Sequence, residues 1–219
     1  MDKKKSIAVA VILLFILIIG GMLAYFTDTD TASNTFTLGD NIDISLSEPS
    51  WVASNAEGIH PGTTVPKDPT VKNESTSTPA YVFAKVTVPC YASTGSTVDT
   101  PLFVLNDSTG VALGTTVGSA GNTGWTLIEV SAIDTTNKTI DYIYAWGSSS
   151  TMTPLAASSV STPSTTAPVF SSVTLKPSLT YAQQQTAPAT TNINVVAYGI
   201  QTDGLSSNTP TGIYALFGA

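Results

Sequence analysis

The sequence contains no arginine, and all eight of its cationic residues are lysine. Fifteen acidic residues give the chain a formal net charge of −7 at pH 7. Arginine is the side chain that binds phosphate through two parallel hydrogen bonds, and a negatively charged surface repels the phosphates of nucleic acids and anionic lipids. We therefore expect no nucleic-acid partner.

Histidine and cysteine occur once each, as His60 and Cys90. A lone cysteine excludes an intrachain disulfide. The common zinc peptidases need two histidines one helical turn apart with a glutamate nearby, and many serine hydrolases need a Gly-x-Ser-x-Gly turn; neither motif is present. We expect no catalytic residue, no metal and no cofactor. A site built from His60 and scattered carboxylates stays open as an alternative to a simple turn histidine.

Charged residues make up only 11 % of the chain, whereas Ser, Thr, Gly, Pro, Ala and Val are abundant. This composition favours strands joined by turns, and no helical period follows the N-terminal segment. The sequence therefore predicts an all-β fold, a jelly-roll-like β-sandwich. The expected strands lie within residues 36–46, 69–73, 80–88, 102–105, 125–130, 139–146, 169–175 and 193–200.

The clearest strand pattern is Ala80–Val88, where apolar residues occupy every even position and the odd positions form a mixed face. Residues 147–168 are uncharged and rich in Ser, Thr and Pro, which is typical of a long exposed loop. With that loop included, we expect a single sandwich domain over residues 39–219.

The N-terminus has the three parts of a secretory signal. Lys3, Lys4 and Lys5 precede the thirteen apolar residues Ile7–Ile19, and the segment GGMLA (residues 20–24) follows. We expect residues 1–24 to be a signal peptide that is cut between Ala24 and Tyr25. Thirteen helical residues cover roughly 20 Å, but a helix continuing to Phe26 would just cross a bilayer, so retention as a membrane anchor is the alternative.

Residues 25–38 alternate in the manner of a strand that has too few large apolar groups to fold alone. Threonine, a β-branched strand former, recurs on one face. We expect this segment to be an extended strand that is donated to a neighbouring subunit, although a disordered segment or an intrachain first strand is the alternative. The residues expected to make the donor strand are Tyr25, Phe26, Thr27, Thr29, Thr31, Phe36 and Leu38.

Three segments carry a resemblance to a known family. Residues 24–46 (AYFTDTDTASNTFTLGDNIDISL), with Ala24, the aromatic pair and a Thr-Phe-x-x-Gly segment, resemble the start of exported proteins of the TasA and camelysin family, which are processed by a SipW-type signal peptidase. Residues 61–88 resemble the Pro-Gly block and strand of that family, and residues 197–205 (AYGIQTDGL) resemble one of its late strands. The resemblance implies a jelly-roll subunit of fibres in the extracellular biofilm matrix.

The expected partners are therefore copies of the same chain or related matrix subunits, besides signal peptidase during export. We expect the protein to be secreted to the matrix or cell surface, touching a membrane only through residues 1–24. Two other functions stay open. One is a monomeric adhesin or sugar-binding module on an uncleaved anchor. Tryptophan rings can stack on sugars, and the candidates are Trp51, Trp125 and Trp146, although aromatic residues more often form a core. The other is a secreted peptidase, as camelysin-like relatives are classed.

Overall fold

A computed structural model of the chain describes residues 42–92, 99–158, 164–185, 187, 191–207 and 209–218. All of them belong to one unit, Gly39–Ala219. The predicted signal peptide, its cleavage site and the predicted donor strand lie outside the described residues. Among the described residues, no helix has the length and apolar character required to cross a membrane.

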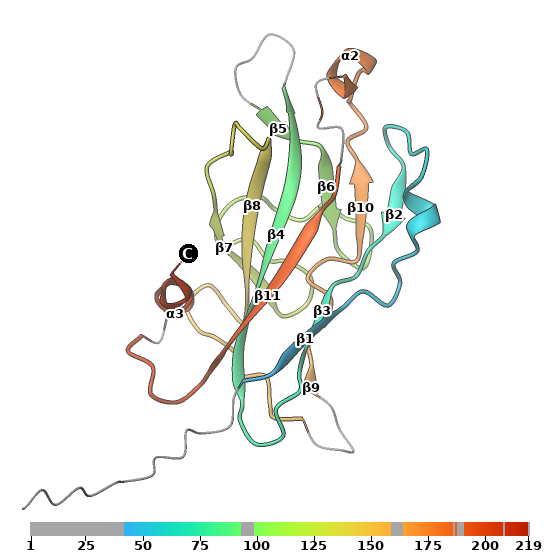
Figure 1. Cartoon of the computed structure of the whole chain (residues 1–219). Helices are drawn as coiled ribbons and strands as arrows, with labels where there is room; N and C mark the ends of the chain where they lie inside the picture. Colours follow the sequence, from blue (N-terminus) through green and yellow to red (C-terminus); the bar gives the residue numbers. More distant parts are fainter. Residues whose placement is uncertain are drawn as a thin grey trace, which may run out of the picture. The chain divides into compact units, whose positions relative to one another are not determined.

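The larger of two β layers is an antiparallel sheet in the order β11-β4-β8-β7, with β5 paired to the end of β4 (Figure 1). The second layer consists of two three-stranded sheets, β2-β10-β6 and β1-β3-β9. The strands are β1 (Ile44–Ser47), β2 (Thr64–Pro66), β3 (Thr70–Asn73), β4 (Ala80–Ala92), β5 (Asp99–Pro101), β6 (Phe103–Asn106), β7 (Trp125–Val130), β8 (Thr139–Trp146), β9 (Ser164–Thr165), β10 (Ser172–Leu175) and β11 (Asn194–Gln201).

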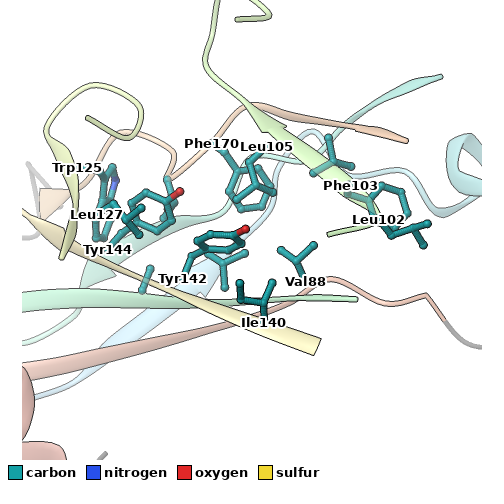
Figure 2. Close-up of a cluster of buried hydrophobic side chains, with 14 of the residues drawn as sticks. Val88, Leu102, Phe103, Leu105, Trp125, Leu127, Ile140, Tyr142, Tyr144 and Phe170 are labelled. Atoms are coloured by element: carbon teal, nitrogen blue, oxygen red, sulfur yellow. The ribbon is translucent and has the colours of Figure 1, made fainter. Parts of the chain in front are cut away.

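One hydrophobic core lies between the layers. Its side chains come from β4, β7 and β8 on one side and from the two smaller sheets on the other, so the sheets pack face to face. The even positions of β4 from Ala80 to Cys90 are fully buried in this core, as the alternation over residues 80–88 predicted. Trp125, Tyr144, Leu127 and Phe170 are among its largest buried side chains (Figure 2). The predicted all-β sandwich is confirmed.

The outer face of β4 is fully buried at Phe83, which the sequence did not predict. Phe83 lies on the face expected to be mixed, yet it is 0 % exposed. Its ring centroid is 5.4 Å from that of Tyr214 and 5.8 Å from that of Phe217. These residues belong to α3 (Pro210–Tyr214) and η2 (Ala215–Phe217), which cover the sheet near the C-terminus (Figure 1).

Four short helical segments correct the expectation that no helix follows the N-terminal segment. Besides α3 and η2 they are η1 (Ala53–Ala56) and α2 (Tyr181–Gln184). The Thr180 hydroxyl accepts a hydrogen bond from the Gln183 backbone and the Gln183 side chain accepts one from the Thr180 backbone, so α2 begins with a capping box. The side chain of Thr209 likewise caps α3, and both helices are too short to show a hydrophobic period.

The segment 147–168 is less exposed than predicted. Met152 and Leu155 are each 4 % exposed, and the backbones of Leu155 and Ala80 exchange two hydrogen bonds. The buried Asn73 amide donates to the carbonyls of Leu155 and Ala156 at 3.2 and 3.1 Å. An exposed loop is therefore the wrong interpretation for the first part of this segment, because two apolar side chains and a buried amide hold it against the sandwich.

Candidate functional site

The edges of the sheets are the first candidates for a site, because an edge presents unpaired backbone groups to other chains. Strand β7 ends the large sheet on one flank, but its outer backbone is already hydrogen-bonded. Gly118 N–H donates to Leu127 O at 2.8 Å, Leu127 N–H donates to Ser119 O at 2.9 Å, and Gly121 N–H donates to Trp125 O at 2.9 Å. The preceding loop therefore covers this edge.

The edges of the sheet β2-β10-β6 are also protected. Leu113 N–H donates to Leu105 O at 2.8 Å, so a loop covers β6. Strand β2 has three residues and ends in Pro66, which cannot donate to a further strand. In the remaining sheet, the outer strands β1 and β9 have only four and two residues. Short edge strands of this kind offer few backbone groups for pairing.

Strand β11 is the long free edge of the described structure. All eight of its residues pair with β4, from Asn194 opposite Thr87 to Gln201 opposite Ala80. No other described strand pairs with β11, and no described backbone group outside β4 is hydrogen-bonded to it. Val196 on this strand is 44 % exposed. The strand therefore offers a continuous row of N–H and C=O groups that can accept another strand.

The first described residues of the chain lie against this same strand. A Cβ atom placed on Gly199 of β11 would lie 2.9 Å from Cγ2 of Ile44 and 3.0 Å from Cγ2 of Ile42. Glycine is needed here because the side chains of residues 42 and 44 occupy that space. Residues 25–38, including Tyr25, Phe26, Thr27, Thr29, Thr31, Phe36 and Leu38, lie outside the described part, as do the cleavage residues Ala24 and Tyr25, so the donor strand stays a prediction.

His60 lies in an exposed turn. Its backbone N–H donates to Thr63 Oγ1 at 3.1 Å, and its carbonyl accepts from Thr63 N–H at 2.8 Å. Among the described residues, no group of three or more His, Cys, Asp or Glu side chains is placed to hold a metal ion. The structure therefore does not bring His60 together with the carboxylates that a metal site would require.

Three carboxyl groups near the surface have a lowered pKa, and local hydrogen bonds explain each shift. The Lys72 ammonium and the Ser45 hydroxyl lower the pKa of Glu74. The hydroxyl of Thr109 and the backbone N–H of Val111 lower the pKa of Asp107. The backbone and side chain of Asn137 lower the pKa of Asp134. Such carboxylates stabilise turns and pairs of strands; a general acid needs the opposite shift.

The tryptophans divide between core and surface. Trp125 is 1 % exposed, its indole N–H donates to Ala167 O at 2.8 Å, and its ring packs edge-on against Trp146 at 5.4 Å. These two form a cross-strand core pair, as predicted. Trp51 is 37 % exposed, and the ammonium of Lys67 lies 4.9 Å from the centroid of its ring. Of the three tryptophans, only Trp51 is left as a sugar-stacking candidate.

Lys67 is itself a buried charge that is neutralised. Its ammonium is 2.6 and 2.7 Å from the two carboxylate oxygens of Glu48, and its residue is 7 % exposed. Cys90 is a buried thiol, and its burial disfavours intermolecular disulfide formation. Among the described residues, neither Lys67 nor Cys90 belongs to a group of side chains placed to hold a metal ion.

Sequence reasoning placed a strand at residues 193–200 but did not identify it as an edge. Strand order depends on pairings between residues far apart in the chain, and no local signal reports it. Edge strands commonly carry Lys or Pro, which hinder pairing with a strand of another chain. Neither residue occurs in Asn194–Gln201, and this is the one sequence signal that the strand can pair at a free edge.

Comparisons with known proteins add one finding. Residues 1–90 match the sequence model of a family described as camelysin metallo-endopeptidase. No curated protein and no solved structure gave a significant match to the chain. The matched range contains the two N-terminal segments that carried the resemblance, residues 24–46 and 61–88. The resemblance to the TasA and camelysin family is therefore confirmed, over residues 1–90 of the chain.

Proposed function

We propose that this protein is a structural subunit of an extracellular fibre or biofilm matrix and that it has no catalytic activity of its own. In this proposal residues 1–24 direct export and are removed. Residues 25–38 of one copy then add to the outer edge of β11 in a neighbouring copy. The mature protein is secreted and has no membrane segment, and its partners are copies of itself or related subunits.

The single observation that carries the proposal is the free edge of β11. The other long edge of the large sheet is covered by its own loop, whereas the eight residues of β11 have no described backbone hydrogen-bond partner beyond β4. A strand that adds to an open edge gains a ladder of backbone hydrogen bonds, and its side chains select the partner. Residues 25–38 have strand alternation and lack the apolar groups needed to fold alone.

The chain without residues 25–38 is expected to stay monomeric under conditions in which protein beginning at Tyr25 forms filaments. Electron microscopy and light scattering measure the outcome. A sharper version replaces Thr29 and Thr31 with proline, which removes backbone donors, and compares this variant with one that carries valine at both positions. The valine variant should assemble, because valine is also a good strand former. Filaments formed by residues 39–219 alone would exclude strand donation.

The family description favours a peptidase as the second candidate function, so hydrolysis needs its own test. The expected result is that purified protein shows no metal-dependent cleavage of casein beyond the buffer blank. Should cleavage occur, replacing His60 with alanine is expected to leave its rate unchanged, because the described residues assemble no ligand set around that side chain. A rate that falls to the blank in His60→Ala would instead support a camelysin-like peptidase.

A further inference from the structure

A cavity of about 410 Å³ opens between the layers on the flank opposite β11. Its walls include Phe103 and Leu105 from β6 and Ile140, Tyr142 and Tyr144 from β8. The volume lies in the range of small-molecule sites, which is about 300–1,000 Å³. Because β11 and β7 are the two ends of the large sheet, this cavity is separate from the edge proposed for assembly.

Two tyrosine hydroxyl groups in this cavity have no hydrogen-bond partner among the described residues. Tyr142 is 4 % exposed and Tyr144 is 1 % exposed. Every described side-chain oxygen or nitrogen that is sealed from solvent has a hydrogen-bond partner. Because these two hydroxyls have none, they are not sealed, and they open into the cavity that their residues line. Figure 2 shows both hydroxyls directed from β8 toward the facing layer, where Leu105 and Phe170 lie.

The two tyrosine hydroxyls without partners favour the binding of a polar ligand atom in the cavity. A hydroxyl held in an apolar wall gains most when a partner in the cavity completes its hydrogen bonds. Burial raises the pKa of Tyr142 to about 12, and it raises the pKa of Tyr144 as well. Both groups are therefore neutral donors at physiological pH, suited to an uncharged or anionic oxygen.

Lys176 supplies a positive charge on the same cavity wall. Its ammonium lies 5.6 Å from the ring centroid of Tyr91, and among the described residues no carboxylate lies within ion-pair distance of it. In a chain with a net charge of −7, a half-buried cation without a carboxylate partner favours an anionic ligand. Three other lysines pair with carboxylates: Lys67 with Glu48, Lys72 with Glu74 and Lys85 with Asp141.

We propose that this cavity binds a small amphipathic carboxylate that carries a second, uncharged oxygen. The carboxylate pairs with Lys176, the apolar body lies against Phe103, Leu105 and Ile140, and the second oxygen accepts or donates a hydrogen bond at the tyrosine hydroxyls. A hydroxylated medium-chain fatty acid has this chemistry. The ligand class follows from charge, apolar lining and the two tyrosine hydroxyls, and it does not depend on fibre assembly.

The test uses three ligands of equal chain length in titration calorimetry with the purified protein: 10-hydroxydecanoate, decanoate and 1,10-decanediol. Saturable one-to-one binding is expected, with affinity highest for 10-hydroxydecanoate. Lys176→Gln should weaken its binding about tenfold and remove the preference for the acid over the diol, since charge-assisted hydrogen bonds are the stronger ones. Lys72→Gln is the matched control and should leave binding unchanged.

Two further pairs of variants keep the proposal falsifiable. Tyr142→Phe with Tyr144→Phe should remove the preference for 10-hydroxydecanoate over decanoate while the protein stays folded. Thr115→Trp, at an exposed lining position, should block binding, whereas Thr116→Trp next to it should not. The proposal is overturned if no ligand binds saturably, if the diol binds as well as the acids, or if Thr115→Trp binds normally. It is also overturned if a peptide of residues 25–38 displaces the ligand, because that result would assign the cavity to the donated strand.

Discussion

A proline at one of two adjacent positions of β11 is expected to abolish fibre growth without unfolding the subunit. In a strand, successive backbone N–H groups point to opposite edges. Of Val196 and Ala197, one therefore donates toward β4 and the other toward the free edge. Proline at the outward position removes a donor that only a neighbouring copy would use, and its ring obstructs an incoming strand.

The two proline variants are each other's control. The variant with proline at the position whose N–H points to β4, the inward variant, loses a hydrogen bond to β4. It is expected to unfold at a markedly lower temperature in a circular dichroism melt. The outward variant should melt within a few degrees of the unmodified protein, yet it should form no filaments by electron microscopy. If both variants still polymerise, β11 is not the accepting edge, whatever the role of residues 25–38.

Phe83→Ala is expected to reduce the free energy of unfolding by about 3–5 kcal/mol, the usual effect of truncating a buried phenylalanine. Its ring is 0 % exposed between β4 and the C-terminal helices, where it contacts Tyr214 and Phe217. Removing it deletes two of the ring contacts that hold α3 and η2 on the sheet. Chemical denaturation, followed by tryptophan fluorescence, measures the change.

Leu216→Ala is the matched control for that experiment. Leu216 belongs to η2 but is 48 % exposed, so its truncation should change stability by no more than about 0.5 kcal/mol. Hydrogen exchange would locate the effect of Phe83→Ala, with faster exchange expected in α3. Equal stability of the two variants would show that the C-terminal helices contribute little to the fold.

The parts of the fold that the sequence predicted are those with local patterns. Ala80–Val88 alternates because one face of β4 lies in the core, and residues 125–130 and 139–146 match β7 and β8 exactly in extent because turn residues border them. The C-terminal helix had no such pattern. α3 has five residues, fewer than two turns, and it begins through its Thr209 cap and Pro210 rather than through a periodic apolar face.

The candidate site was harder to predict than the strands that form it. The free edge of β11 follows from its pairing with β4, more than one hundred residues earlier in the chain, and from the loop that covers β7. The ligand cavity has the same origin, since Lys176 follows β10 while Tyr142 and Tyr144 lie on β8. Composition reports none of these long-range contacts.

The placement of the last residues has a consequence for synthesis. β4 pairs with β11 only when Asn194–Gln201 is available, and Tyr214 and Phe217 cover Phe83 on its outer face only when α3 and η2 are available. A nascent chain therefore cannot complete the sandwich until residues 194–217 have left the ribosome, and contacts this distant in sequence form slowly. If the chain is exported as proposed, late closure of the sandwich would favour threading through a translocation channel, because such a channel admits an unfolded polypeptide.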